Sequence, residues 1–319
     1  MTNNDFDVSA PWQKSNQAWW DWYVSLAFES KMPTELMNYV LPAELQPLSG
    51  LEETLATIDE EYRVDDGAVE LFRKQGFIKL KNVFSGSEIA VLRRAIIKEV
   101  LSFLSEHPQA EKQKFLSLDM VWRSNLIVKK FVVNRRLAGI VGKLLGVPAV
   151  RLYHDNVLSK EPGCGRTPWH YDTHHFPICT PNVVTAWCPV QPIPIEMGPL
   201  IFASPLSAYK HVDKLRFNKN DNSYDKLVEK TFKENNIKII CEAYELGEVS
   251  FHHNLSFHCA SPNMTKESRL VLANTYFEDG AKVVDSPTMV SGDWKKFIPD
   301  TAPNEVIRTS CNPICWKEN

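Results

Sequence analysis

The sequence predicts a mainly β fold with flanking helices, arranged as an antiparallel sandwich or barrel. After about residue 149, short apolar runs rich in β-branched and aromatic residues follow one another closely. Clusters of Pro, Gly and Asn separate these runs, which is typical of antiparallel β proteins. Helical periodicity is strongest before this region, so we expect the helices to flank the sheets.

The helical signals upstream are specific. Ser85 and Glu88 have the spacing of a capping box, and apolar residues continue at helical period as far as Val100. A further helix is expected over 134–145, where a glycine and then a proline end it. Residues 65–84 predict a short helix, a glycine break and the alternating strand FIKLKNVF.

Six strands are expected in the β-rich region. They are AVRLYHDNVLS (149–159), VVTAWCPV (183–190), GPLIFAS (198–204), NIKII (236–240), EVSFHH (248–253) and RLVLANTYF (269–277). A polar, lysine-rich insertion at 207–236 interrupts them, and we expect a surface loop or partial helix there, open to a role as a lid. The phosphate-binding glycine motifs of nucleotide folds are absent from the sequence.

Residues 1–64 are expected to form an N-terminal helical extension packed on a domain that spans 65–319. Trp19, Tyr23 and Leu26 share one helical face. This face is also compatible with a cover over an active site or with a dimer contact, so the sequence leaves both a monomer and a homodimer open.

Composition narrows the class of protein. The 36 basic and 39 acidic residues give a net charge of −3, which argues against a nucleic-acid partner. The sequence has neither a secretory signal nor an apolar stretch long enough to span a membrane. Its seven cysteines are odd in number and form no C-x-x-C pair, as expected for reduced thiols in a cytoplasmic protein.

Two His-x-Asp motifs are candidates for metal binding. His170 and Asp172 lie between strand runs, where residues two apart point to the same face. The second motif, His211 and Asp213, lies among lysines and is interpreted as solvated surface. Nine histidines in a chain of this acidity would give about one such motif by chance, so the pattern needs a third ligand.

The segment 247–277 offers that ligand. His258 ends a strand-like run before a Ser-Pro-Asn turn, whereas His252 and His253 are expected to alternate across a sheet. Arg269 then opens an apolar strand, where a guanidinium is costly unless it meets an anion. An internal salt bridge is the alternative for this arginine.

Two imidazoles and one carboxylate are the ligands of non-haem Fe(II) oxygenases. Three protein ligands leave three positions of an octahedral ion for a 2-oxo acid and O2. The remaining carboxylate of such a co-substrate needs a cation, and Arg269 supplies one. The residues therefore indicate Fe(II) as cofactor, with O2 and a 2-oxo acid that has a second carboxylate as co-substrates.

Four segments over about residues 65–280 resemble the phytanoyl-CoA dioxygenase-like family of Fe(II)/2-oxoglutarate-dependent oxygenases. They are QGFIKLKNVFS, SKEPGCGRTPWHYD, VVTAWCPVQPIPIEMGPLIFASPLS and GEVSFHHNLSFHCASPNMTKESR. The resemblance implies a double-stranded β-helix core, that is, a cupin-like jelly roll. It also implies that the chain is an enzyme.

The same resemblance implies roles for individual residues. His170, Asp172 and His258 match the iron ligands, and Arg269 matches the residue that holds the distal carboxylate of 2-oxoglutarate. Three further positions match the co-substrate pocket: Lys160, Trp187 and Thr185. A carboxylate at 172 disfavours halogenation, because related halogenases have Gly or Ala there.

The expected reaction is hydroxylation, desaturation or cyclisation at an unactivated C–H bond of a small molecule, with release of succinate and CO2. A natural-product or amino-acid-like biosynthetic intermediate is favoured over an acyl-CoA, because no basic cluster awaits a CoA phosphate. A jelly-roll protein that binds a metal or ligand without turnover and a cupin-like enzyme that does not use 2-oxoglutarate are the rivals. His174 and His175 are expected to form hydrogen bonds beside the site or to touch substrate.

Overall fold

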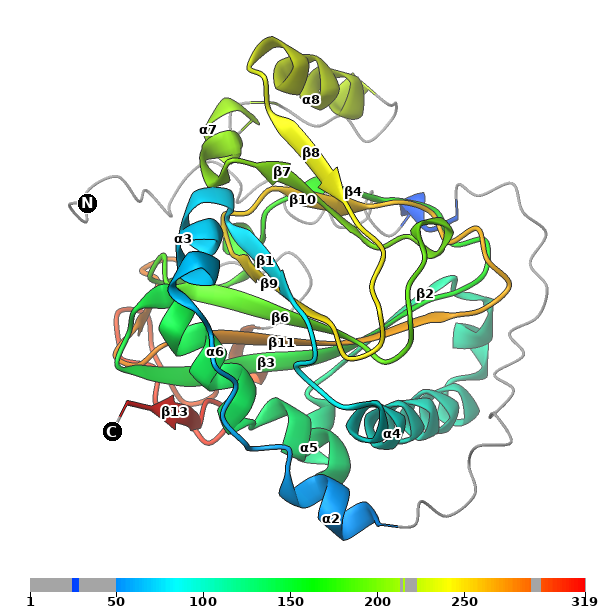
Figure 1. Ribbon diagram of the computed structural model, residues 1–319, viewed down its shortest axis with the longest axis vertical. Coiled ribbons are helices and arrows are strands. Elements are labelled where there is room, and N and C mark those ends of the chain that lie inside the picture. Colours follow the sequence, from blue (N-terminus) through cyan, green and yellow to red (C-terminus); the bar gives the residue numbers. More distant parts are fainter. Residues whose placement is uncertain (1–24, 29–49, 213–214, 216–222, 288–293, 319) are drawn as a thin grey trace.

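Two antiparallel sheets face each other at the centre of the molecule, and helices cover their outer sides (Figure 1). The computed structural model describes residues 25–28, 50–212, 215, 223–287 and 294–318. This arrangement confirms the mainly β fold with flanking helices. The two facing sheets form the double-stranded β-helix that the family resemblance implied.

The larger sheet has seven strands in the order β1-β9-β6-β11-β3-β13, and β2 also pairs with β3. Its strands are β1 (Phe77–Leu80), β2 (Phe115–Asp119), β3 (Ala149–Lys160), β6 (Val183–Pro189), β9 (Val249–His253), β11 (Arg269–Glu278) and β13 (Ile314–Lys317). The smaller sheet, β4-β10-β7-β8, has β4 (Thr167–His170), β7 (Leu200–Ser204), β8 (Lys238–Cys241) and β10 (His258–Ala260). A short pair joins β5 (Ile178–Cys179) to β12 (Lys282–Val283).

The described helices are α2 (Leu51–Ala56), α3 (Asp66–Gln75), α4 (Gly86–Glu106), α5 (Leu126–Val132), α6 (Arg135–Leu145), α7 (Tyr209–Val212) and α8 (Ser223–Glu234). Of these, α3, α4 and α6 lie close to where the sequence predicts helices. The capping box of Ser85 and Glu88 is present at the start of α4. Gly76 and Gly146 end α3 and α6 with positive φ angles, a conformation that glycine adopts without strain.

The larger sheet has two unlike faces. Its outer face packs against α4, α5 and α6 in the main apolar core. On β3, alternate residues of this face, including Tyr153 and Val157, are fully buried. The residues between them point to the other sheet, and His154, Asn156 and Leu158 remain half-buried there. The inner face of β3 therefore lines a space that solvent reaches.

An apolar cluster closes part of the space between the sheets. The rings of Phe77 on β1 and Phe202 on β7 stack at a centroid distance of 4.1 Å. Trp187 and Val271 of the larger sheet belong to the same buried cluster as Ala260 of the smaller one. This packing fixes the separation of the sheets at one end of the interior.

The insertion at 207–236 contains the helix α8, in agreement with the partial helix that was one of the two expectations for it. Its helix α8 buries Tyr224, Val228 and Phe232, which lie on one face of the helix because they are spaced four residues apart. These side chains pack on the outer face of the smaller sheet, where Trp169 contacts Phe232. The insertion therefore supplies the apolar cover of that sheet (Figure 1). Its role as a lid stays a prediction.

A short piece of the N-terminal region also packs on the smaller sheet. Leu26 is 1% exposed and belongs to the apolar cluster that includes Trp169. The backbone N–H of Gly165 donates to the carbonyl of Ala27 at 2.9 Å. A Cβ atom at position 165 would lie 1.9 Å from the carbonyl oxygen of Leu26, so only glycine allows this approach. The predicted tryptophan-rich face, apart from Leu26, lies outside the described residues.

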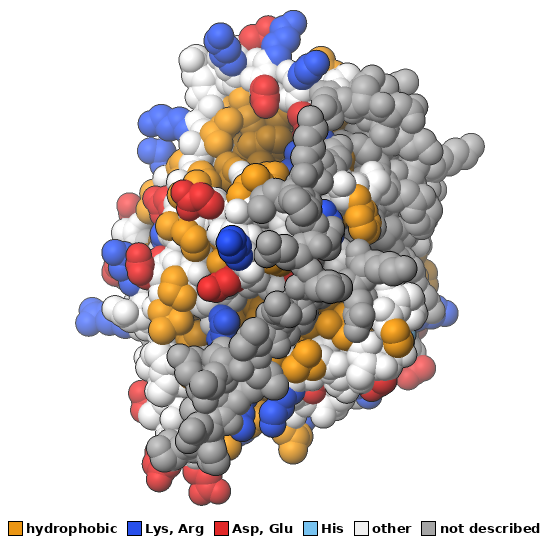
Figure 2. All heavy atoms as spheres, turned by 90° about the vertical axis from the view of Figure 1, so that its right-hand side faces the viewer, with side chains coloured by type: hydrophobic (Ala, Val, Ile, Leu, Met, Phe, Trp, Pro, Cys, Tyr) orange, Lys and Arg blue, Asp and Glu red, His pale blue; other side chains and the backbone are white. Residues whose placement is uncertain are grey.

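All six strands expected in the β-rich region are present, but several elements were not predicted. These are β2, β4, β5, β10, β12, β13 and α5. The cysteines are free thiols, as expected. Among the described residues, no helix combines the length and apolarity needed to cross a membrane. Positive and negative side chains are interspersed over the described part of the face in Figure 2.

Asp155 is a buried carboxyl group on the outer face of β3. Its Oδ2 accepts the backbone N–H of Trp122 at 3.2 Å. Its Oδ1 and the Oδ1 of its cross-strand partner Asn274 have no hydrogen-bond partner among the described residues. Burial raises the pKa of Asp155 to about 7, so the folded protein retains this proton up to near neutral pH.

Replacing Asp155 with Asn should remove this titration. The unfolded chain releases the proton near the ordinary pKa of 3.8. The free energy of unfolding of the wild type therefore falls as the pH rises from 3.8 to about 7. Between about pH 5 and about pH 7.5, the free energy of unfolding of Asp155→Asn should rise by about 2 kcal/mol relative to that of wild type. Urea unfolding of the metal-free proteins measures this difference. The exposed Asp300→Asn should show no gain, and a pH-independent difference for Asp155→Asn would contradict the prediction.

Candidate metal centre

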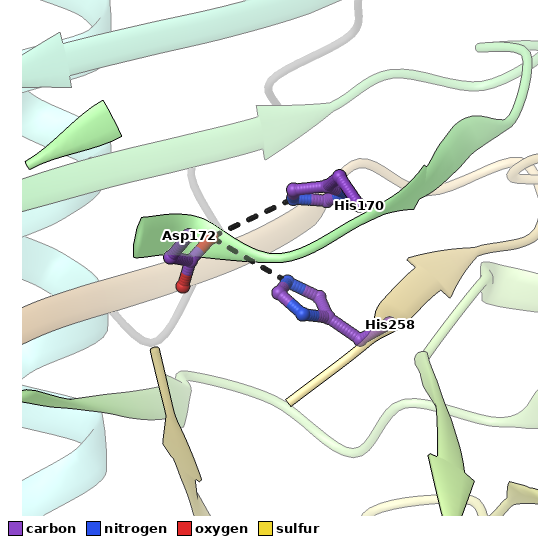
Figure 3. Close-up of side chains that lie close together, drawn as sticks. All are labelled: His170, Asp172 and His258. Atoms are coloured by element: carbon purple, nitrogen blue, oxygen red, sulfur yellow. Dashed lines mark ion pairs between the residues drawn. The ribbon is translucent and has the colours of Figure 1, made fainter. Parts of the chain in front are cut away.

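Three side chains from the smaller sheet and the loop after β4 converge inside the molecule (Figure 3). Asp172 Oδ1 lies 3.7 Å from His170 Nε2 and 3.8 Å from His258 Nε2. The ligand atoms of the three residues all lie within 4.8 Å of one another. The structure thus brings together the three residues that the sequence proposed as metal ligands.

The backbone explains this convergence and corrects two details. His170 is the last residue of β4, and Tyr171 is still extended (φ −134°, ψ 151°), so the side chains of His170 and Asp172 point the same way. Asp172 itself starts a 3₁₀ helix instead of continuing a strand. His258 begins β10 instead of ending a strand, and it lies directly opposite His170 in the β4–β10 pair.

Both imidazoles of this group are held in one tautomer. The Nδ1–H of His170 donates to the carbonyl of Pro168 at 2.8 Å. The Nδ1–H of His258 donates to the carbonyl of Ser256 at 2.9 Å. Each ring therefore turns an unprotonated Nε2 toward Asp172, as histidine ligands of metal ions do.

The protonation states suit a cation. Burial, together with the neighbouring imidazole of His258, lowers the pKa of His170 to about 3. Burial lowers the pKa of His258 to about 4. Burial alone would raise the pKa of Asp172, but the imidazoles of His258, His252 and His170 outweigh it and hold that pKa below its usual range. Two neutral imidazoles and one carboxylate are the donor set of a non-haem Fe(II) site, so these residues fit the iron implied by the sequence.

Two buried cations lie side by side farther along the interior. Lys160 and Arg269 are direct partners in the β3–β11 pair and are both at most 2% exposed. Burial, and then the charge of Arg269, lowers the pKa of Lys160 to about 7. Lys160 Nζ donates to the carbonyl of Ser261 at 2.7 Å. Like charges at this depth are costly, so the pair is suited to an anion between the sheets.

Trp187 and Gly198 complete this region. The Arg269 guanidinium lies over the Trp187 ring, 5.2 Å from its centroid, and donates through Nη1 to the carbonyl of Gly198. Gly198 has a φ of 77°, and a Cβ there would lie 2.3 Å from the carbonyl oxygen of Ser261. The turn before β7 therefore has a structural role, and it also helps to orient Arg269.

Thr185 lies farther along the larger sheet than the two cations, since its partner on β11 is Thr275. Its hydroxyl forms a hydrogen bond with Thr275 Oγ1 at 3.0 Å. Thr185 is the register partner of both Thr275 on β11 and His252 on β9. It therefore belongs to a row of polar side chains that crosses the larger sheet next to the His-Asp-His group.

His252 is the residue of this site to which the sequence analysis gave no role. Its Nε2 lies 3.3 Å from Asp172 Oδ2. The predicted alternation of His252 and His253 is correct, since the first is 2% exposed and the second is half-buried on the other face. The alternation indicates that one of the two points inward, but the pairing of the sheet decides which one.

Two further candidate histidines have described side chains, His175 and His211. The ring of His175 lies 6.1 Å from that of His170, and burial lowers the pKa of His175 to about 4. His175 is therefore beside the metal group, as predicted. His211 is exposed on α7, in agreement with its interpretation as solvated surface, and its motif partner lies outside the described residues.

Solved structures of non-haem oxygenases share this fold. The carbocyclase SnoK from nogalamycin biosynthesis has a TM-score of 0.64 at 20% identity, over 79% of this chain and 96% of SnoK. EctD from S. alaskensis with bound Fe has a TM-score of 0.61 at 16% identity, over 79% and 91% of the two chains. EvdO2 from Micromonospora carbonacea var. aurantiaca, complexed with 2-oxoglutarate, has a TM-score of 0.52 at 17% identity, over 73% and 98%.

No curated protein matches the sequence. The family model described as phytanoyl-CoA dioxygenase matches residues 72–271, which include β1, the His-Asp-His group and the start of β11. Since this match covers well over half of the chain, the protein belongs to the phytanoyl-CoA dioxygenase family of Fe(II)/2-oxoglutarate-dependent oxygenases.

Proposed function

We propose that the protein hydroxylates, desaturates or cyclises a small organic molecule at an unactivated C–H bond, with His170, Asp172 and His258 as its iron ligands. The observation that supports this most strongly is the common orientation of two unprotonated Nε2 atoms and one carboxylate oxygen. When bound, Fe(II) with 2-oxoglutarate and O2 supplies the oxidation, and in hydroxylation the C–H bond becomes C–OH while 2-oxoglutarate becomes succinate and CO2.

Arg269 and Lys160 are proposed to hold the distal carboxylate of 2-oxoglutarate. The Arg269 guanidinium stays protonated and can bind a carboxylate through two parallel hydrogen bonds, and a bound anion would favour the protonated form of Lys160. Trp187 stacks on the guanidinium and restricts its orientation. Thr185 is proposed to contribute a hydroxyl beside the co-substrate, since it lies on the same strand and face as Trp187.

The substrate is proposed to lie against the inner face of β3. His154, Asn156 and Leu158 point there and are half-buried, so the surface offers both polar and apolar contacts to a small molecule. Neighbours of similar fold act in nogalamycin biosynthesis or hold 5-hydroxyectoine, which supports a natural-product or amino-acid-like substrate. An acyl-CoA is the alternative. Succinate release against a panel of both classes, with product mass as the readout, decides between them.

Asp172→Ala should abolish turnover and the weak visible absorption band that Fe(II) with bound 2-oxoglutarate gives under anaerobic conditions. The variant loses the only carboxylate of the metal group among the described residues, so Fe(II) affinity should fall by at least about 100-fold. Anaerobic Fe(II) titration with and without 2-oxoglutarate measures both effects.

The second His-x-Asp motif provides a matched control for this variant. His211 is exposed, so His211→Ala should retain the band and the turnover of wild type. Retained succinate release by Asp172→Ala would show that the ligand assignment is wrong. Absence of the band in iron-loaded wild type would favour a metal protein that does not use 2-oxoglutarate.

Arg269→Ala should raise the KM for 2-oxoglutarate by about 10- to 100-fold, because a charged hydrogen-bonded contact is lost. Arg269→Lys keeps the charge but lacks the planar guanidinium, so its KM for 2-oxoglutarate should lie between those of wild type and Arg269→Ala. Succinate release at varied 2-oxoglutarate measures this KM, while Fe(II) affinity without co-substrate should stay as in wild type. An unchanged KM in Arg269→Ala would remove the role proposed for this residue.

A further inference from the structure

His252 approaches the metal group from the opposite sheet. The three proposed ligands come from β4, β10 and the loop after β4, whereas His252 lies on β9 of the larger sheet. Its Nε2 is 3.3 Å from Asp172 Oδ2, and its side chain is almost completely buried. The ring lies 4.7 Å from that of His258 and 5.7 Å from that of Phe202, centroid to centroid. His252 is therefore fixed between the two sheets.

The two oxygens of Asp172 face different groups. Oδ1 is almost equidistant from the Nε2 atoms of His170 and His258, at 3.7 and 3.8 Å. Oδ2 instead receives the Nε2–H of His252. The two oxygens of a carboxylate are equivalent acceptors, so this hydrogen bond to Oδ2 distinguishes Oδ1 as the oxygen that faces the imidazole pair.

The tautomer of His252 is opposite to that of the proposed ligands. His170 and His258 donate through Nδ1 to backbone carbonyls, which leaves Nε2 as an acceptor. His252 has no hydrogen-bond partner for its buried Nδ1 among the described residues, and its Nε2 faces a carboxylate oxygen, which can only accept. A ligand imidazole normally has its other N–H bonded to a carbonyl or carboxylate. By this criterion His252 is a donor to Asp172 and not a fourth ligand.

We propose that His252 is a positioning residue that holds Asp172 with one oxygen toward the metal and the other turned away. This inference rests on the proposed iron site. By holding Oδ2 in a hydrogen bond, His252 would leave Asp172 to bind a metal ion through Oδ1 alone. The Nε2–H group is the part of the side chain that the role requires.

Two substitutions separate this role from simple packing. His252→Phe keeps a planar ring of similar size but has no N–H group. His252→Gln places an amide N–H at about the reach of Nε2. His253→Phe is the matched control, because it changes the neighbouring residue on the other face of β9, where His253 Nδ1 accepts from the backbone N–H of Leu255.

Co(II) binding to the metal-free proteins, followed by the visible absorption of the bound ion, tests the proposal without turnover. His252→Phe should weaken Co(II) binding by about 10- to 100-fold and change the bound spectrum, as expected for loss of an outer-shell partner. His252→Gln should restore both to near wild type, and His253→Phe should match wild type. Thermal melting of the metal-free variants identifies any loss that comes from misfolding, and in that case His252→Gln alone decides the result.

Each result has a distinct meaning. If wild type binds no Co(II), the proposed iron site itself is wrong and the inference falls with it. If wild type binds Co(II) and a folded His252→Phe binds it equally with the same spectrum, only the role of His252 is overturned. If a folded His252→Gln is as weak as His252→Phe, the imidazole is needed as such, and the proposed role as a hydrogen-bond donor is overturned.

Discussion

The pairing of β4 with β10 is the interaction on which the centre of this protein depends. It places His258 directly opposite His170, although the two residues are far apart in the sequence. On the outer side of the same strands, Trp169 and the neighbouring Phe257 lie parallel at a centroid distance of 5.6 Å beneath α8. Apolar packing on one face of the smaller sheet thus supports the geometry of the His-Asp-His group on the other.

The larger sheet supplies polar and charged side chains that face the His-Asp-His group and the space beside it. Its outer face is anchored by the helical core, so part of its inner face can carry polar and charged side chains. Along this face the side chains change from a polar row near Asp172, which includes Thr185 and His252, to the cationic pair of Lys160 and Arg269. A diacid that spans these two regions would meet the metal at one end and positive charge at the other.

Much of this arrangement could be predicted from the sequence. Alternating strands, the capping box and the His-x-Asp spacing of His170 and Asp172 are local patterns, and they agree with the final fold. The strands β4 and β10 were missed because they are only a few residues long and are defined by pairing, not by periodicity. The role of His252 was missed because it depends on which face of β9 turns inward. In the helix at 223–234, the apolar residues are spaced four apart, but the lysines between them led to the prediction of only a surface loop or partial helix.

The close approach between Leu26 and Gly165 links the start of the chain to the strand that carries His170. Leu26 fills part of the apolar cluster around Trp169, and the loop that receives it leads directly into β4. A shortened chain that begins at residue 65 would expose this apolar surface to water, next to the proposed iron ligand His170, which directly follows Trp169. Residues before β1, including Leu26, are therefore part of the apolar cover of the smaller sheet.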